Sequence, residues 1–113
     1  TQQEKIEKLA RELMGWHKGK NHFISTKGHY EKVWLNEKSE TVATLEWNPY
    51  EHIADAWMIV EKLIQKYVFT LDYDYIGECW ACTIFGGQQG FTGHGSVQEA
   101  ICEAALRTLE EAK

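Results

Sequence analysis

The sequence is short of proline, of cysteine and of long apolar runs, and each shortage excludes a class of protein. Its 113 residues hold one proline beside 5 Trp, 5 Tyr and 4 Phe, which excludes collagen-like, linker-rich and intrinsically disordered chains. The longest apolar run, residues 56–60, is far shorter than the roughly 20 residues that span a bilayer, and the first residues lack the pattern of a signal peptide. Three cysteines are an odd number that a secreted disulfide framework would not usually leave, so we expect a reducing cytoplasm.

Positive charge is also scarce. The chain has 12 Lys and Arg against 17 Asp and Glu, a net charge of −5. An acidic balance gives no general attraction to phosphate backbones or anionic lipids, so neither nucleic acid nor a membrane is an expected partner. The hydrophobic fraction of 43% and a length typical of one domain predict a single domain over residues 1–113, with a core that needs no metal or disulfide.

Spacing and capping residues predict the first two helices. Apolar side chains three and four residues apart indicate a helix over residues 3–14, which Gly15 ends and on which Trp16 folds back. Asn48 as N-cap and Pro49 at the first helical position begin the second helix. Its predicted buried face is broad and consists of Ile53, Ala56, Trp57, Ile59, Val60, Leu63, Ile64 and Tyr67.

Four strands are predicted in two hairpins. Residues 30–35 and 40–47 are rich in β-branched and aromatic side chains and flank a polar turn, whereas residues 68–75 and 79–85 alternate clearly on either side of a turn. Residues 17–29 are predicted as a loop because glycine and small polar residues interrupt any pattern. With a last helix, the expected fold is α+β in the order α-β-β-α-β-β-α, with helices packed on an antiparallel sheet.

The paired cysteines and the paired aspartates could indicate chemical sites, but both have ordinary structural explanations. Cys79 and Cys82 have the C-x-x-C spacing of redox and zinc sites, but within a strand they point to opposite faces, which favours packing in the core. A zinc site completed by His94 or by the third cysteine would require the strand prediction to be wrong. Aspartates 72 and 74 share one face of a strand, as on any solvated face, and no two histidines form an i, i+4 pair on a helix. We therefore expect no metal, no cofactor and no catalytic centre.

The best candidate ligand site is a glycine-rich segment. Residues 86–95 contain five glycines and are predicted as a loop, and Ser96 with Glu99 then forms the capping box of the last helix. Backbone amides that lead into a helix N-terminus can hold an anion, and Phe91 would be an exposed aromatic ring. The alternative is a mobile loop closed by an ordinary cap. The candidate ligand-binding residues are Trp47, Tyr50, Phe91, Gly93, His94, Gly95 and Ser96.

The end of the chain also resembles a double-stranded-RNA-binding domain, with two strands, a Gly-His-Gly-Ser loop and an alanine-rich helix. That domain needs lysines at the start of the helix to meet phosphates. Here Val97, Gln98, Glu99 and Glu103 occupy the helix, which argues against RNA.

Taken together, three segments resemble the phage ABA-sandwich family of small proteins from phages and prophages, mostly of Gram-positive bacteria. They are Leu-Met-Gly-Trp at 13–16, Trp-Asn-Pro at 47–49 before a helix with Ala-Trp and Val-Glu-Lys, and the last helix over 99–106. The aromatic strand with Trp80 fits as well. The resemblance implies a single antiparallel sheet sandwiched between helices, and it carries no catalytic motif. Residues 17–29 match no pattern of the family.

The resemblance implies a non-enzymatic binding protein that acts in the cytoplasm of a host bacterium. One hypothesis is an anti-defence protein that sequesters a small anionic, nucleotide-derived immune signal, with the base stacked on Trp47, Tyr50 or Phe91 and the phosphates held by the amides of residues 93–96 and by His94. The alternative is a protein-interaction module that inhibits a host defence protein by presenting an acidic face to a basic site. In either case a homodimer or higher homo-oligomer is expected, because the many aromatic side chains leave several for an interface.

Overall fold

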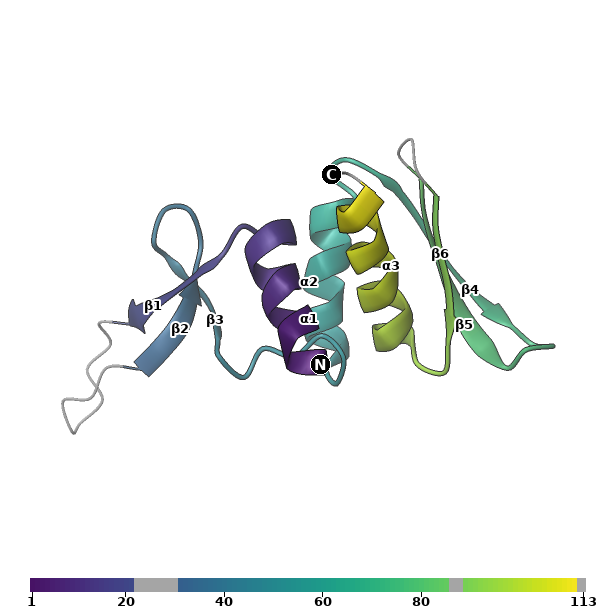
Figure 1. Cartoon of the computed structure of the whole chain (residues 1–113), viewed down its shortest axis with the longest axis horizontal. Helices are drawn as coiled ribbons and strands as arrows, with labels where there is room; N and C mark the ends of the chain where they lie inside the picture. Colours follow the sequence, from purple (N-terminus) through teal and green to yellow (C-terminus); the bar gives the residue numbers. More distant parts are fainter. Residues whose placement is uncertain (22–30, 86–88, 112–113) are drawn as a thin grey trace.

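The computed structural model describes residues 1–21, 31–85 and 89–111 (Figure 1). Helices alternate with two groups of three strands along the chain. The elements are α1 (Gln2–Lys8), the π-helical turn η1 (Leu9–Leu13), β1 (His17–Asn21), β2 (Glu31–Leu35), β3 (Thr41–Thr44), α2 (Ile53–Leu63), β4 (Val68–Asp74), β5 (Cys79–Phe85), β6 (Gln89–His94) and α3 (Val97–Glu111).

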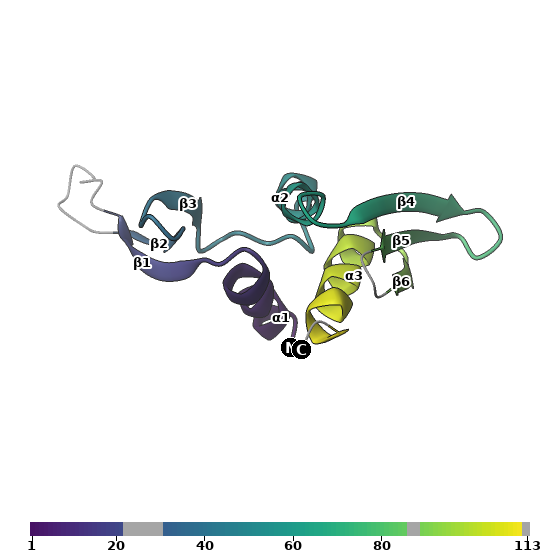
Figure 2. The same ribbon diagram turned by 90° about the horizontal axis from the view of Figure 1, so that it is seen from above.

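The molecule is elongated, with extents of 54 × 28 × 23 Å, and its helices lie between two sheets (Figure 1). The antiparallel sheets have the orders β1-β2-β3 and β4-β5-β6. The predicted α+β class is confirmed, but there are two small sheets instead of one sheet between helices. Each half of the chain adds one strand to its own hairpin, and α2 separates β3 from β4, so each sheet is completed locally. Figure 2 shows α2 on one side of the helix layer, the same side as β4, and α1 and α3 on the other.

The first helix ends as predicted. Gly15 has a φ of 74°, the left-handed conformation that glycine adopts without strain. The Trp16 amide donates to the Ala10 carbonyl at 2.9 Å, which folds the chain back on the last turn. The Trp16 ring then meets the edge of the Trp47 ring, with centroids 5.0 Å apart and planes at 70°. This pair joins the first helix to the segment that follows β3.

Residues 17–21, predicted as loop, form strand β1 instead. They pair with β2 in antiparallel register, with Gly19 opposite Val33. A Cβ atom on Gly19 would overlap the Leu35 side chain, so the glycine makes room for it. The rest of the predicted loop, residues 22–30, lies outside the described residues. The predicted hairpin of residues 30–35 and 40–47 is confirmed as β2 and β3.

The predicted start of the second helix at Asn48 and Pro49 is wrong. Asn48 instead stabilises a separate turn, in which its Oδ1 atom accepts the amides of Tyr50 at 3.0 Å and Glu51 at 3.3 Å. His52 is extended, with φ −113° and ψ 120°, and α2 begins after it. The Asn48 amide donates to the Asp55 carboxylate at 2.9 Å, which ties the turn to the first turn of the helix.

The predicted buried face of α2 is only half right. Ala56, Ile59, Val60 and Leu63 are buried in the core. The helix ends at Leu63, four residues earlier than predicted, and Ile53, Trp57 and Ile64 are exposed.

The second hairpin and the last helix follow the predictions. Strands β4 and β5 pair over their whole length, with Thr70 opposite Thr83. The Glu99 amide donates to Ser96 Oγ at 3.1 Å, so the predicted cap of α3 is confirmed. α3 packs against β5 and β6. The side chains that allow this close contact are mostly small and fully buried: Ala100, Ile101, Cys102, Ala104 and Ala105.

Candidate functional site

The predicted ligand-binding residues lie in different parts of the fold. Trp47 is a core residue with 3% of its surface exposed, packed on Trp16. Its indole nitrogen is buried and finds no hydrogen-bond partner among the described residues. Such a position suits packing between the first sheet and the helices better than stacking on a ligand.

The predicted glycine loop is largely a strand. Phe91, Gly93 and His94 belong to β6 and lie opposite Thr83, Ala81 and Trp80 of β5. Regular pairing replaces the flexible backbone that the glycine content predicted; residues 86–88 lie outside the described residues. Gly95 follows β6 at an open position, because a Cβ there would meet no described atom within 4 Å.

Tyr50 comes close to the start of α3 from the turn before α2. It borders a groove of about 360 Å³ together with Lys5, Glu99 and Glu103. The pKa of Tyr50 is raised well above its ordinary value, first by burial and then by the negative charge of Glu103. Ser96 lies about one turn before Glu99 and two turns before Glu103, so the structure brings Tyr50 and the α3 N-terminus together beside carboxylates.

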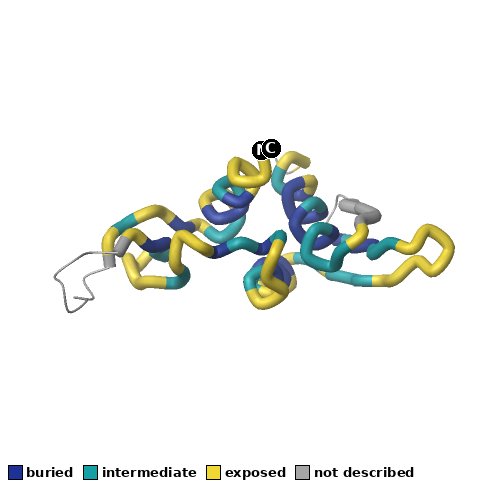
Figure 3. The backbone as a smooth tube through the Cα atoms, turned by 90° about the horizontal axis from the view of Figure 1, so that it is seen from below, coloured by how far each residue is buried: buried dark blue, intermediate teal, exposed yellow. Residues whose placement is uncertain are grey.

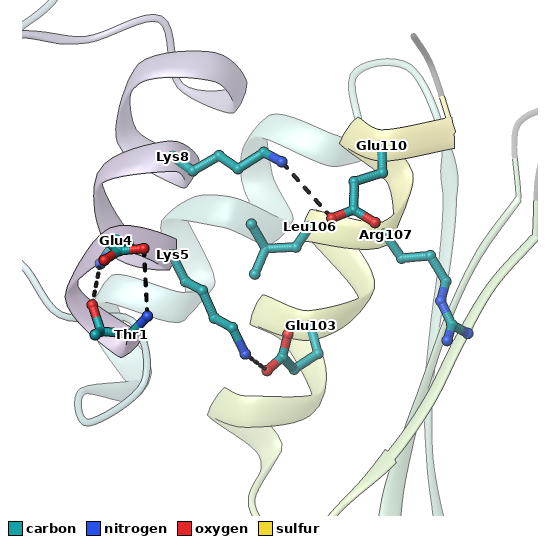
Figure 4. A pocket seen from close by; sticks show the side chains of 8 residues that line it. All are labelled: Thr1, Glu4, Lys5, Lys8, Glu103, Leu106, Arg107 and Glu110. Carbon is teal, nitrogen blue, oxygen red and sulfur yellow. Dashed lines mark hydrogen bonds and ion pairs between the residues drawn. The ribbon is translucent and has the colours of Figure 1, made fainter.

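A groove with a volume of about 580 Å³, the α1–α3 groove, runs between α1 and α3. In Figure 4, Lys5 and Lys8 extend from α1 toward α3, with Leu106 between them. Lys5 Nζ pairs with Glu103 at 2.8 Å and Lys8 Nζ with Glu110 at 3.8 Å. The hydrogen bond to Glu103 is the main cause of the raised pKa of Lys5. The complete lining is Thr1, Glu4, Lys5, Lys8, Glu103, Leu106, Arg107 and Glu110.

The thiols are core groups. Cys82 and Cys102 are fully buried, and burial raises the pKa of Cys82 to about 12 and that of Cys102 above its ordinary value. Because the thiolate is the reactive form, both are poor nucleophiles. Cys79, which lies on β5 with Cys82, is half-buried. In the parts of the chain that the structure describes, no group of three or more metal-binding side chains occurs.

Two exposed apolar surfaces are the features that the sequence interpretation missed. The first, the α2 stripe, consists of Ile53, Trp57 and Ile64, which are 51%, 47% and 57% exposed. The second, the hairpin tip, projects away from the helices at the end of β4 and β5 (Figure 3). Tyr75 and Ile76 there are 85% and 97% exposed. Tyr73 meets both Tyr75 and Trp80 edge to face, with centroids 5.1 Å apart, so the hairpin tip consists of Tyr73, Tyr75, Ile76 and Trp80.

The sequence model of the phage ABA sandwich domain matches residues 7–106. The chain belongs to this family. The match begins within α1, ends within α3 and includes both sheets, so the expected phage association is confirmed. No curated protein and no solved structure matches this ABA sandwich domain. Among the residues described, none of its helices is long and apolar enough to span a bilayer.

Proposed function

We propose that this ABA sandwich domain is a non-enzymatic binding protein that acts in the cytoplasm of the host, where it inhibits a host defence protein by direct contact. The observation that supports this most is the exposure of Ile53 and Trp57 on α2. Tryptophan is enriched among the residues that dominate binding energy at protein interfaces. Contiguous apolar side chains on a small protein often mark such a site.

The surroundings of the α2 stripe favour a basic partner. On another flank of α2, a groove of about 480 Å³ separates the helix from β3 and is bordered by Glu46 and Asp55. A lysine or arginine of a partner that reaches around the helix can bind these carboxylates, of which Asp55 also accepts the Asn48 amide. The net charge of −5 adds a long-range attraction for a basic surface, which increases the association rate.

The experiment is capture from a bacterial lysate with two matched variants. Trp57→Glu places a charge in the stripe, whereas Gln65→Glu places the same charge on an exposed position beyond the helix end. We expect the unchanged chain and Gln65→Glu to retain the same host protein and Trp57→Glu to lose it. If Trp57→Glu has an unchanged melting temperature and retains that protein equally well, the α2 stripe is not the binding surface.

Sequestration of a nucleotide-derived immune signal is the second candidate. It is supported by the open position of Gly95 before a helix of 15 residues, whose first amides can hold a phosphate. The carboxylates of Glu99 and Glu103 near Tyr50 oppose an anion there. Protein binding is therefore the preferred proposal.

A thermal-shift experiment separates the two candidates. Cyclic dinucleotides and cyclic ADP-ribose derivatives are each added to the folded protein. A ligand at 100 times its dissociation constant stabilises the folded state by about 2.7 kcal/mol, which raises the melting temperature by several degrees. Gly95→Asp should abolish any such shift. The absence of a shift with every nucleotide would exclude sequestration of these ligands and leave the protein-binding proposal standing.

A further inference from the structure

Strand β4 is an unusually open sheet edge. It is the first strand of the sheet β4-β5-β6, so one of its edges pairs with β5 and the opposite edge is open. Edge strands are usually short, or carry proline or charged side chains, above all lysine, because an open backbone pairs with other chains. Two other edges follow this rule, since β1 has two lysines and β3 has four residues. β4 has seven residues, Val-Phe-Thr-Leu-Asp-Tyr-Asp, without lysine or proline, and its charged side chains are two aspartates near one end.

We infer that the occupant of this edge is a second copy of the chain, paired antiparallel so that Leu71 of one copy lies opposite Leu71 of the other. The two three-stranded sheets then form one six-stranded sheet about a two-fold axis. Phe69 faces Tyr73 of the second copy, an aromatic pair, and Thr70 faces Asp72. Such cross-strand pairs stabilise an antiparallel sheet.

The length of β4 and its two aspartates favour this register. It is the register that pairs all seven residues of the strand, whereas a shift by two residues toward Thr70 leaves Tyr73 and Asp74 without a partner in β4 of the other copy. A shift by two residues in the other direction places Asp72 opposite Asp72, and a further shift places Asp72 opposite Asp74. Like charges directly opposite are destabilising. Shifting by a single residue would exchange the faces, although Phe69 and Leu71 already pack on the core. In the Leu71-centred register each carboxylate faces an uncharged side chain.

The same axis accounts for apolar groups at both ends of β4. Val68, which begins the strand, is 62% exposed, and Ile64 just before it belongs to the α2 stripe. In the paired arrangement the hairpin tip of one copy extends past Val68 of the other, toward its Ile64. Figure 2 shows that α2 and β4 lie on the same side of the molecule. In the inferred dimer we expect one two-fold contact to cover the β4 edge and the exposed apolar groups at its two ends, Ile64, Tyr75 and Ile76.

Trp57 and Ile53 lie toward the other end of α2 and stay available to a host protein. The inference is thus independent of the proposed function, and either can fail alone.

Sedimentation velocity on the full chain, over a wide range of concentrations, tests the pairing. Thr70→Asp places two carboxylates opposite each other on each side of the two-fold axis, next to Leu71, and we expect the dimer dissociation constant to rise about tenfold. Within one copy, positions 70 and 72 face Thr83 and Ala81, which are uncharged, so the same change creates no carboxylate pair across the strands of the protomer. The double variant Thr70→Asp with Asp72→Thr exchanges the pair and should restore the dimer.

This rescue distinguishes pairing from a general loss of stability. Asp72→Thr alone should leave the dimer intact, and melting temperatures check that each variant is folded. A monomeric unchanged chain at every concentration would overturn the inference. So would a folded Thr70→Asp variant that dimerises as well as the unchanged chain, or a folded double variant that stays monomeric.

Discussion

Replacing Asn48 by alanine tests the turn that precedes α2. The Asn48 side chain accepts two backbone amides, of which the Tyr50 amide is partly buried and the Glu51 amide is exposed. A typical hydrogen bond contributes about 0.5–1.5 kcal/mol, and the exposed amide can bind water instead. We therefore expect Asn48→Ala to lower the free energy of unfolding by about 1–2 kcal/mol, in the range found for loss of a helix cap.

Urea unfolding followed by tryptophan fluorescence measures this loss. With a slope of about 1–3 kcal/mol per molar urea, the midpoint should fall by about 0.5–1 M while the slope stays constant. Asn48→Asp is the matched control, because its carboxylate accepts the same amides, and it should stay within about 0.5 kcal/mol of the unchanged chain. All chains are compared at one concentration. A stable Asn48→Ala variant, or an equal loss in both variants, would refute the assigned role of the side chain.

Three further predictions concern packing, thiols and pH. Gly19→Ala should lower the free energy of unfolding by about 1–3 kcal/mol through overlap with Leu35, and Leu35→Ala should relieve part of that penalty in the double variant, as urea titration would report. A colourimetric thiol reagent at neutral pH should react quickly with Cys79 alone, and with all three cysteines in urea. Glu103 raises the pKa of Lys5 in the folded chain above the ordinary lysine pKa of 10.5. The small stabilisation from the pair is therefore present below pH 10.5 and is lost as the pH rises through the pKa of the folded state. Melting curves recorded across this pH range should show the loss for the unchanged chain and not for Glu103→Gln.

Local signals predicted the parts of the fold that local interactions determine. The turn at Gly15 needs only a left-handed residue, and the cap at Ser96 needs only a hydroxyl three residues before an amide. Strand β1 could not be predicted in this way, because His-Lys-Gly-Lys-Asn has no strand preference and is held by pairing with β2. Strand β6 could not be predicted for the same reason, because its glycines indicate a loop and the strand is held by pairing with β5.

The site was harder to predict than the fold. Trp47 is aromatic and precedes a turn, which fits a ligand platform, but the second ring that buries it comes from residue 16, far away in the sequence. For α2, spacing correctly identified an apolar arc, yet the arc is wider than the surface available to cover it. Which part stays exposed depends on where α3 and the first sheet pack, and the sequence of one helix does not contain that information.

Because the helices lie between two sheets, the two sheets should differ in their stability against local unfolding. α3 covers the strands of the second sheet, whereas the first sheet is joined to the helices largely through the rings of Trp16, Trp34 and Trp47. Separating that joint exposes three indoles but leaves α3 and its sheet intact. The amides of β1 to β3 should therefore exchange with solvent through partial openings, while those of β5 exchange only when the whole chain unfolds. The sheet that contains the least regular sequence would thus be a semi-independent cooperative unit, attached to a more persistent half.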